Sequence, residues 1–116
     1  PIFVDMDYHF FSMAMLNLLH NAYKYSAEVK KIEIGVIKKI GTILIFVKDC
    51  GVGIPQSELK NIFRPFYRIG EKDRRGVGLG LALIHSIIKR HFGKISVSSE
   101  IGKGSTFMIE IKESVS

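Results

Sequence analysis

The sequence predicts an α/β two-layer sandwich, in which a mixed β-sheet carries helices on one face. Its 116 residues suit a single domain, and 47% of them are hydrophobic, which is ample for a core. The expected order is a helix, two strands, a short helix, a loop, a long helix and two further strands. Strands joined as hairpins beside helices favour two layers. The lack of strict strand–helix alternation argues against a Rossmann sheet.

The first expected helix covers residues 7–25. Hydrophobic side chains recur there at spacings of three and four residues, which is the period of a helix that buries one face. Asp5 or Asp7 lies at its start and suits the capping position. The recurring residues are Phe10, Phe11, Ala14, Leu18 and Ala22.

Two strands are expected next. Hydrophobic residues alternate with others over residues 32–38, which is typical of a half-buried strand. Residues 42–48 form a nearly continuous hydrophobic run, which is typical of a central strand. Gly41 marks the turn between them, and a glycine-rich turn covers residues 49–55.

The second half of the chain predicts two helices and two strands. A short helix is expected over residues 56–63 and a long one over residues 79–91. Between them, residues 68–78 are polar and charged, with little to bury, so a mobile loop is expected there. Strands are expected over residues 94–98 and 105–112, the second with clear alternation.

Composition excludes several classes of protein. No hydrophobic run approaches the roughly 20 residues of a membrane span, and no signal peptide is present. Cys50 is the single cysteine, which excludes an internal disulfide framework and fits a reducing compartment. Four scattered histidines offer no zinc-finger ligand pair. The chain opens on Pro1 rather than Met, which predicts that it is a piece of a longer protein.

The net charge is +6, from 17 Lys and Arg against 11 Asp and Glu. These basic residues occur in scattered pairs rather than in one long run. The pattern therefore favours a solvated basic surface, or a small anionic ligand such as a nucleotide, over nucleic acid.

Three segments carry candidate functional residues. Asn17, Asn21 and Lys24 form a polar stripe along the first helix, since each residue turns about 100° around the axis. The stripe either faces water or offers an amide oxygen to a hard cation and an ammonium to an anion. Asp49 ends the central strand beside two glycines, in either an ordinary turn or a site where a carboxylate accepts from an exocyclic amine. Residues 76–81 lead into a helix, whose first N–H groups suit phosphate, although a glycine triplet alone is a weak signal.

Five segments, in order, resemble the motifs of the catalytic and ATP-binding domain of bacterial sensor histidine kinases. That domain belongs to the GHKL superfamily of Bergerat-fold proteins, with the gyrase, heat-shock chaperone and mismatch-repair ATPases. The resemblance runs from about residue 5 to 112, so residues 1–116 are expected to be one catalytic ATP-binding domain. The segments are an N box at 16–26, a first glycine box at 49–54, an F box at 62–68, a second glycine box at 76–81 and a closing hairpin at 102–107.

The resemblance implies a role for individual residues. Asn21 is the expected Mg²⁺ ligand, and it is expected to act in catalysis together with Lys24. Lys24 and Tyr25 would contact the phosphates or the edge of the nucleotide, and Asp49 would accept from the adenine amino group. Thr106 is expected to support the adenine pocket. The remaining implied contacts of ATP or ADP are Asn17, Gly51, Gly53, Ile54, Phe63, Gly76, Gly78, Leu79, Gly80 and Leu81.

Further details of the site follow from the same resemblance. Gly51 and Gly53 would let the backbone pass close to the base. Residues 68–78 would form a lid over the phosphates, with Gly80 at its helix end. Cys50 stands where many members of the family carry Asn, and its side chain is not expected to touch adenine.

The resemblance also implies a reaction. The chain would bind Mg–ATP and donate the γ-phosphoryl group to a histidine on a separate dimerisation domain of the same protein. That histidine would feed a cognate response regulator in two-component signal transduction. Asn17 stands where the gyrase-like hydrolases carry a water-activating glutamate, and an amide cannot act as that base. The sequence therefore favours a kinase; an anti-sigma-factor-type serine kinase and a GHKL ATPase are the alternatives.

The phosphoacceptor is expected to lie outside this chain. None of its four histidines opens a His-Glu or His-Asp pair. The expected location is the cytoplasm, as the cytoplasmic portion of a membrane-bound sensor kinase whose membrane helices precede Pro1. No nucleic-acid partner is expected.

Overall fold

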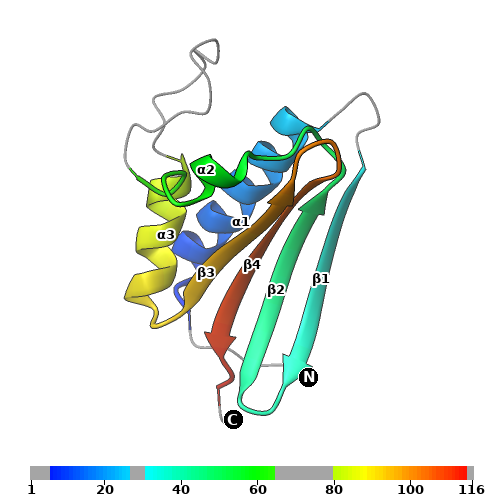
Figure 1. Ribbon diagram of the computed structural model, residues 1–116. Coiled ribbons are helices and arrows are strands. Elements are labelled where there is room, and N and C mark those ends of the chain that lie inside the picture. The colour runs from blue at the N-terminus through cyan, green and yellow to red at the C-terminus, as the bar shows by residue number, and fades with distance from the viewer. Residues whose placement is uncertain (1–5, 27–30, 65–79, 115–116) are drawn as a thin grey trace.

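The computed structural model describes residues 6–26, 31–64 and 80–114. Every expected helix and strand is present within them (Figure 1). The short helix is briefer than expected, because only its first turn is helical before the chain continues in turns. The elements are α1 (Tyr8–Tyr25), β1 (Ile32–Lys39), β2 (Thr42–Asp49), α2 (Gln56–Leu59), α3 (Gly80–Arg90), β3 (Lys94–Glu100) and β4 (Gly104–Lys112).

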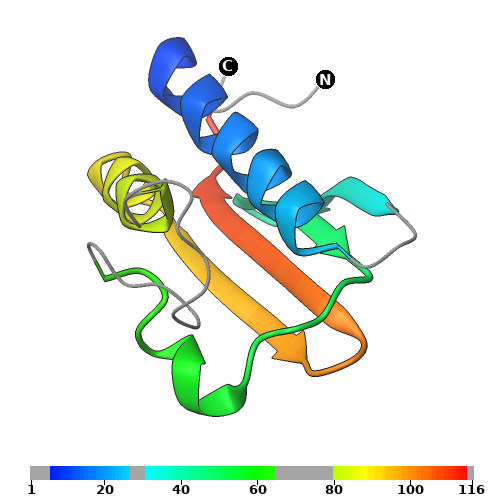
Figure 2. The same cartoon turned by 90° about the horizontal axis from the view of Figure 1, so that it is seen from above.

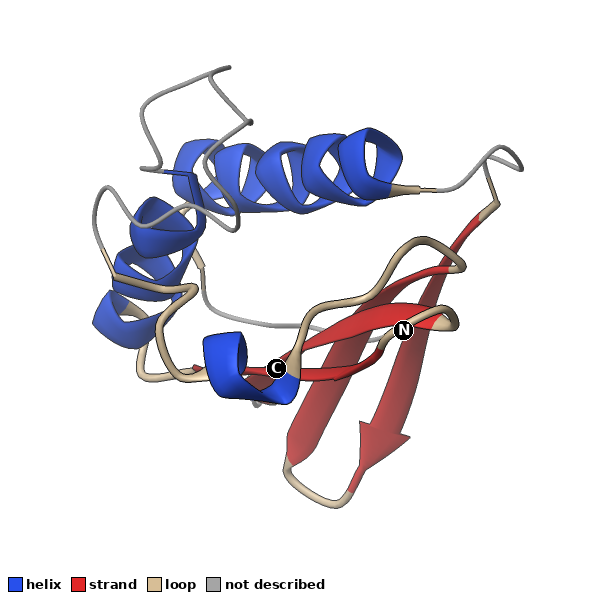
Figure 3. Cartoon of the chain, turned by 45° about the horizontal axis from the view of Figure 1, so that its top comes forward, coloured by secondary structure: helices blue, strands red, loops and turns tan. Residues whose placement is uncertain are grey.

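The described elements form two layers, as the sequence predicts. Helices α1 and α3 lie on the same face of the sheet, and α2 lies beside the end of β3 (Figures 2 and 3). The strand order is β1-β2-β4-β3, and every neighbouring pair is antiparallel. The expectation of a mixed sheet is therefore not met in these strands. Strands β2 and β3 run in the same direction, but β4 folds back between them and separates them (Figure 1).

Side-chain alternation along the central strands builds the core. Val47 pairs with Phe107, and Ile109 pairs with Ile45 on one side and Ile95 on the other, so these residues share the face under the helices. Burying each such side chain contributes about 1.5–3 kcal/mol. The buried core comprises Ala14, Leu18, Ala22, Val47, Ile54, Ile62, Ile84, Ile87, Ile88, Phe107, Ile109 and Ile111.

Strand β1 departs from the sequence prediction. It was expected to be half-buried, but Ile34 is 51% exposed and Val36 is 55% exposed. Both share the helix face with Val47 and Ile45 of β2. Helix α1 packs against β2 and α3, and α3 packs against β3, so the edge strand β1 receives little cover.

Two hydrogen-bonded contacts fix the start of α1. The Asp7 carboxylate accepts a hydrogen bond from the Phe10 N–H at 3.1 Å, which makes Asp7 the predicted cap. The Asp7 N–H donates to His91 Nε2 at 3.2 Å, so the other ring nitrogen, Nδ1, donates to the Ile87 carbonyl at 2.8 Å. His91 thereby ties the end of α3 to the start of α1.

Helix α3 ends through a left-handed residue that is not glycine. Phe92 has a φ of 62°; its N–H bonds the Lys89 carbonyl at 3.0 Å, and the Gly93 N–H bonds the Ile88 carbonyl at 2.9 Å. A left-handed backbone costs an L-residue roughly 1–2 kcal/mol. The Phe92 side chain is 93% exposed and recovers little of this cost by burial.

No helix in the described part of the chain combines the length and the hydrophobicity that crossing a membrane requires.

Candidate functional site

The candidate site lies at one end of the sheet. The last turn of α1, the end of β2, the first described residues of α3 and the β3–β4 hairpin all meet at this end (Figure 1). The turn after β2 is held between two of these elements. The Val52 N–H donates to the Tyr25 carbonyl at 3.2 Å, and the Val52 carbonyl accepts from the Gly102 N–H at 2.9 Å. The turn thus connects α1 to the hairpin.

Asp49 is a buried carboxylate at the start of this turn. Its side chain sits in a residue only 3% exposed. Oδ1 accepts hydrogen bonds from the Gly51 N–H at 2.9 Å and the Ser105 N–H at 3.2 Å. Among the described residues, no group donates to Oδ2. Asp49 therefore has one oxygen held by the protein and one oxygen able to accept from a ligand.

The glycines of this turn are required by contacts within the protein. A Cβ at Gly51 would collide with the Tyr25 carbonyl oxygen, and a Cβ at Gly53 would collide with the Glu100 carbonyl oxygen. Gly53 also has a φ of 78°, which L-residues with side chains rarely adopt. The sequence suggested that these glycines serve the approach of a base, and the structure supplies a second reason for them, which is close packing against α1 and the hairpin.

The polar stripe of α1 borders its buried face. Asn17, Asn21 and Lys24 are all half-buried, so the stripe does not simply face water. The amides of Asn17 and Asn21 form no hydrogen bond with any residue that the structure describes. Lys24 Nζ lies 5.2 Å from the centre of the Tyr25 ring, within the range of a cation–π contact. The stripe thus offers two amides and an ammonium group near the turn that contains Asp49.

Two of the implied nucleotide contacts are engaged in packing. The Phe63 ring lies 5.5 Å from the His85 ring and 6.3 Å from the Phe107 ring, measured between centroids, so it joins the segment after α2 to α3 and the sheet. Ile54 is 8% exposed and belongs to the core, and its N–H donates to Ser99 Oγ at 2.7 Å. Both residues support the shape of the site.

The closing hairpin brings Ser105, rather than Thr106, to Asp49. Thr106 pairs with Lys48 and Ser98, whose side chains are exposed on the face away from the helices. Ser105 shares the inner face with Phe107, and its N–H donates to Asp49. Sequence reasoning missed Ser105, although counting back by two from the buried Phe107 identifies it.

The second glycine box is described only from Gly80 onward. Gly76, Gly78, Leu79 and the expected loop over 68–78 lie outside the described residues. Gly80 opens α3 as described, and a Cβ there would meet nothing within 4 Å. Leu81 is half-buried and packs on the core.

Comparison with known proteins identifies the family. Residues 6–115 match the model of the histidine kinase-, DNA gyrase B- and HSP90-like ATPase family. The chain therefore belongs to this family, and its architecture is the Bergerat fold. Its relatives and structural neighbours narrow the class to the catalytic domains of sensor histidine kinases.

Two curated relatives are sensor kinases. The chain is 40% identical over 113 residues to the sensor protein KdpD of Clostridium acetobutylicum, covering 95% of this chain and 13% of that protein. It is 38% identical over 112 residues to the histidine-protein kinase ArlS of Staphylococcus epidermidis, covering 94% of this chain and 25% of that protein. The chain thus spans only a small part of the length of these relatives.

Solved structures show the same fold. A mycobacterial sensor histidine kinase, MprB, superposes with a TM-score of 0.86 at 26% identity, covering 95% of this chain and 76% of that chain. ShkA, solved as a full-length protein in complex with AMPPNP, superposes with a TM-score of 0.85 over 100% of this chain and 24% of that chain. At 23% identity, the likeness to ShkA shows the fold alone.

Proposed function

We propose that residues 1–116 form one catalytic domain of a longer kinase, which binds Mg–ATP and donates the γ-phosphoryl group to a histidine on a separate dimerisation domain. The phosphohistidine then serves a cognate response regulator in the cytoplasm. The family and its sensor-kinase relatives support the class of reaction. The observation that carries the proposal is the buried Asp49, with one oxygen held and the other able to accept.

The base is recognised by Asp49. Gly51 and Ser105 hold Oδ1 through their backbone N–H groups, which fixes the direction of the carboxylate. Oδ2 then accepts a hydrogen bond from the exocyclic amine of adenine. A base with a carbonyl at that position would set two acceptors against each other in a buried place, which is costly. Asp49 therefore selects adenine.

The residues of α1 fit a magnesium-bound triphosphate. Hard cations prefer oxygen ligands, and the half-buried amide of Asn21 has an oxygen that no described residue engages. Asn21 would hold Mg²⁺, and Lys24 would bind the phosphate oxygens. When bound, Mg²⁺ neutralises charge on the phosphates during transfer. The net charge of +6 adds a favourable field for the anionic nucleotide.

Phosphoryl transfer to histidine needs no activated water from this chain. Asn17 lies one helical turn before Asn21, and an amide cannot remove a proton from water at neutral pH. The role of the chain is then to bind and orient the nucleotide, while the partner domain supplies the nucleophile. Slow hydrolysis and efficient transfer follow from this division.

A titration and a transfer assay test the proposal. ADP should bind more tightly in Mg²⁺ than in chelator, measured by calorimetry. Label from γ-labelled ATP should appear on a purified histidine-containing dimerisation domain as an acid-labile phosphate. Acid-stable label on a serine of a small partner would assign the anti-sigma-factor type instead. Absence of nucleotide binding in both buffers would contradict the proposal.

A further inference from the structure

The hydroxyl of Ser99 is buried and fully hydrogen-bonded. Ser99 is 9% exposed, and its Oγ accepts from the Ile54 N–H at 2.7 Å and donates to the Gly104 carbonyl at 3.1 Å. The Ser105 Oγ lies 2.7 Å from it. A hydroxyl has one proton and two acceptor positions. Since the Ser99 proton goes to Gly104, the Ser105 hydroxyl donates to Ser99, and all of its bonding positions are filled.

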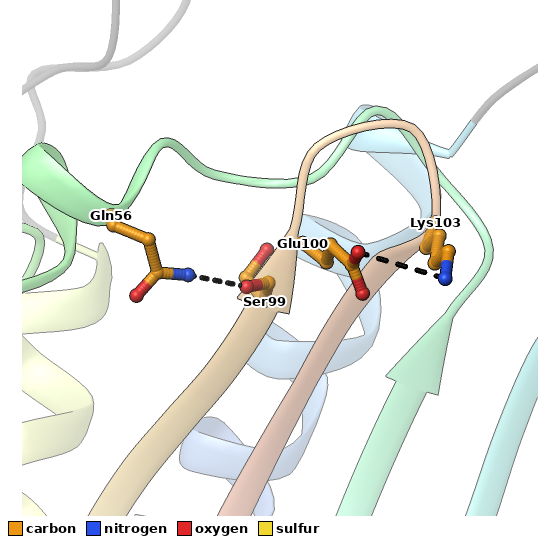
Figure 4. Close-up of polar contacts among 4 residues, drawn as sticks. All are labelled: Gln56, Ser99, Glu100 and Lys103. Carbon is orange, nitrogen blue, oxygen red and sulfur yellow. Dashed lines mark hydrogen bonds and ion pairs between the residues drawn. The ribbon is translucent and has the colours of Figure 1, made fainter.

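Ser99 connects both ends of the turn that carries Asp49. It binds Ile54, at the end of the turn, directly. It binds Asp49, at the start, through Ser105, whose hydroxyl contacts Ser99 and whose N–H donates to Oδ1 of Asp49. The Ser99 carbonyl accepts from Gln56 Nε2 at 2.7 Å, which extends the connection to α2 (Figure 4).

The middle of the turn is held without Ser99. Val52 bonds the backbone of Tyr25 on one side and of Gly102 on the other. Loss of the Ser99 hydroxyl would leave these contacts in place. It would leave the Ile54 N–H and the Gly104 carbonyl without this partner, and buried polar groups without partners drive local rearrangement. The turn would keep its location while the direction of the Asp49 carboxylate relaxes.

We propose that Ser99 is a positioning residue that sets the base selectivity of the nucleotide site, by fixing Asp49 and Ile54 relative to one another. The inference rests on the proposed function, in which Asp49 accepts from the exocyclic amine of adenine. Ser99 does not touch the nucleotide. It acts by holding the acceptor in the direction that favours a base with an amine over a base with a carbonyl.

The test compares ADP with inosine diphosphate, whose base carries a carbonyl in place of the amine. The affinities of both are measured by calorimetry for wild type, Ser99→Ala and Ser98→Ala. Ser98 is the matched control, because it is a neighbouring serine exposed on the outer face of β3. Ser99→Ala should reduce the preference for ADP about tenfold, the effect of one well-aligned buried hydrogen bond. Its affinity for inosine diphosphate should change little, and Ser98→Ala should match wild type.

A second pair of variants isolates the hydroxyl from packing. Ser99→Thr and Ser99→Val add the same branch at Cβ, but only threonine keeps the hydroxyl. Threonine should retain more of the ADP preference than valine. Equal preference in these two variants would overturn the positioning role, even if Ser99→Ala failed to fold.

The outcomes separate the two proposals. If wild type prefers ADP and Ser99→Ala keeps that preference, the inference about Ser99 is wrong and the proposed function stands. If Ser99→Ala weakens both nucleotides equally, Ser99 is a structural residue only. If wild type binds both nucleotides equally, the role of Asp49 fails and the inference fails with it.

Discussion

Replacing Asp49 by asparagine should convert the base-facing acceptor into a donor. The Gly51 and Ser105 N–H groups both donate to Oδ1. In the Asp49→Asn variant these two donors require the amide oxygen, so the amide NH₂ must take the place of Oδ2. The NH₂ group then meets the adenine amine, donor against donor. Loss of a buried hydrogen bond to a charged group costs about 1.5–3 kcal/mol, which corresponds to roughly a 10- to 150-fold weaker affinity for ADP.

The same geometry predicts a gain for a different base. Inosine diphosphate presents a carbonyl to the new NH₂ group, so its affinity should rise relative to ADP. Calorimetric titration of both nucleotides measures the change, and Glu33→Gln, which alters an exposed carboxylate on β1, is the control for the loss of one charge. Because the two N–H groups of the turn keep an acceptor, thermal unfolding should change little. Unchanged ADP affinity, or an equal loss for both nucleotides, would refute the reasoning.

Three further substitutions test other parts of the molecule. Asn21→Ala should abolish the gain in ADP affinity from Mg²⁺ while affinity in chelator remains, because alanine offers no oxygen to the cation; a retained Mg²⁺ gain would exclude this ligand. Phe92→Gly should raise the free energy of unfolding by about 0.5–1 kcal/mol, since relief of the left-handed strain exceeds the added freedom of the unfolded chain; urea denaturation would show no gain if the strain were absent. Gly53→Ala should lower the unfolding free energy by roughly 1–3 kcal/mol or more, because of its positive φ and its contact with Glu100. Gly41→Ala, with a φ of 73° and open space around it, should cost less, and equal losses would contradict the packing argument.

Local periodicity made the elements predictable. The spacing of hydrophobic residues located α1, and Asp7 at its start was a cap that sequence alone identified. The burial of β1 was wrong, because alternation indicates which side chains share a face but not whether a helix covers it. Ile34 and Val36 lie on the helix face of an edge strand that α1 and α3 leave largely open.

The site was predictable where motifs are contiguous. Asp49 and its glycines were found from the residues that follow one strand. Ser105 was missed in favour of Thr106, although the period of two along β4 places Ser105 on the inner face. Ser99 carried no local signal, since its hydroxyl bonds Ile54, 45 residues away in sequence. Such contacts appear only when the fold brings distant segments together.

The fate of the γ-phosphate tests the central claim most directly. The chain is incubated with γ-labelled ATP, first alone and then with a purified histidine-containing dimerisation domain. Free phosphate and protein-bound label are measured over the same period. Because Asn17 offers no base for water, the chain alone should release phosphate slowly, whereas label should pass to the histidine domain faster than it is hydrolysed. Rapid release of phosphate by the chain alone, with no label on the histidine domain, would contradict the account and assign the chain to the gyrase-like ATPases.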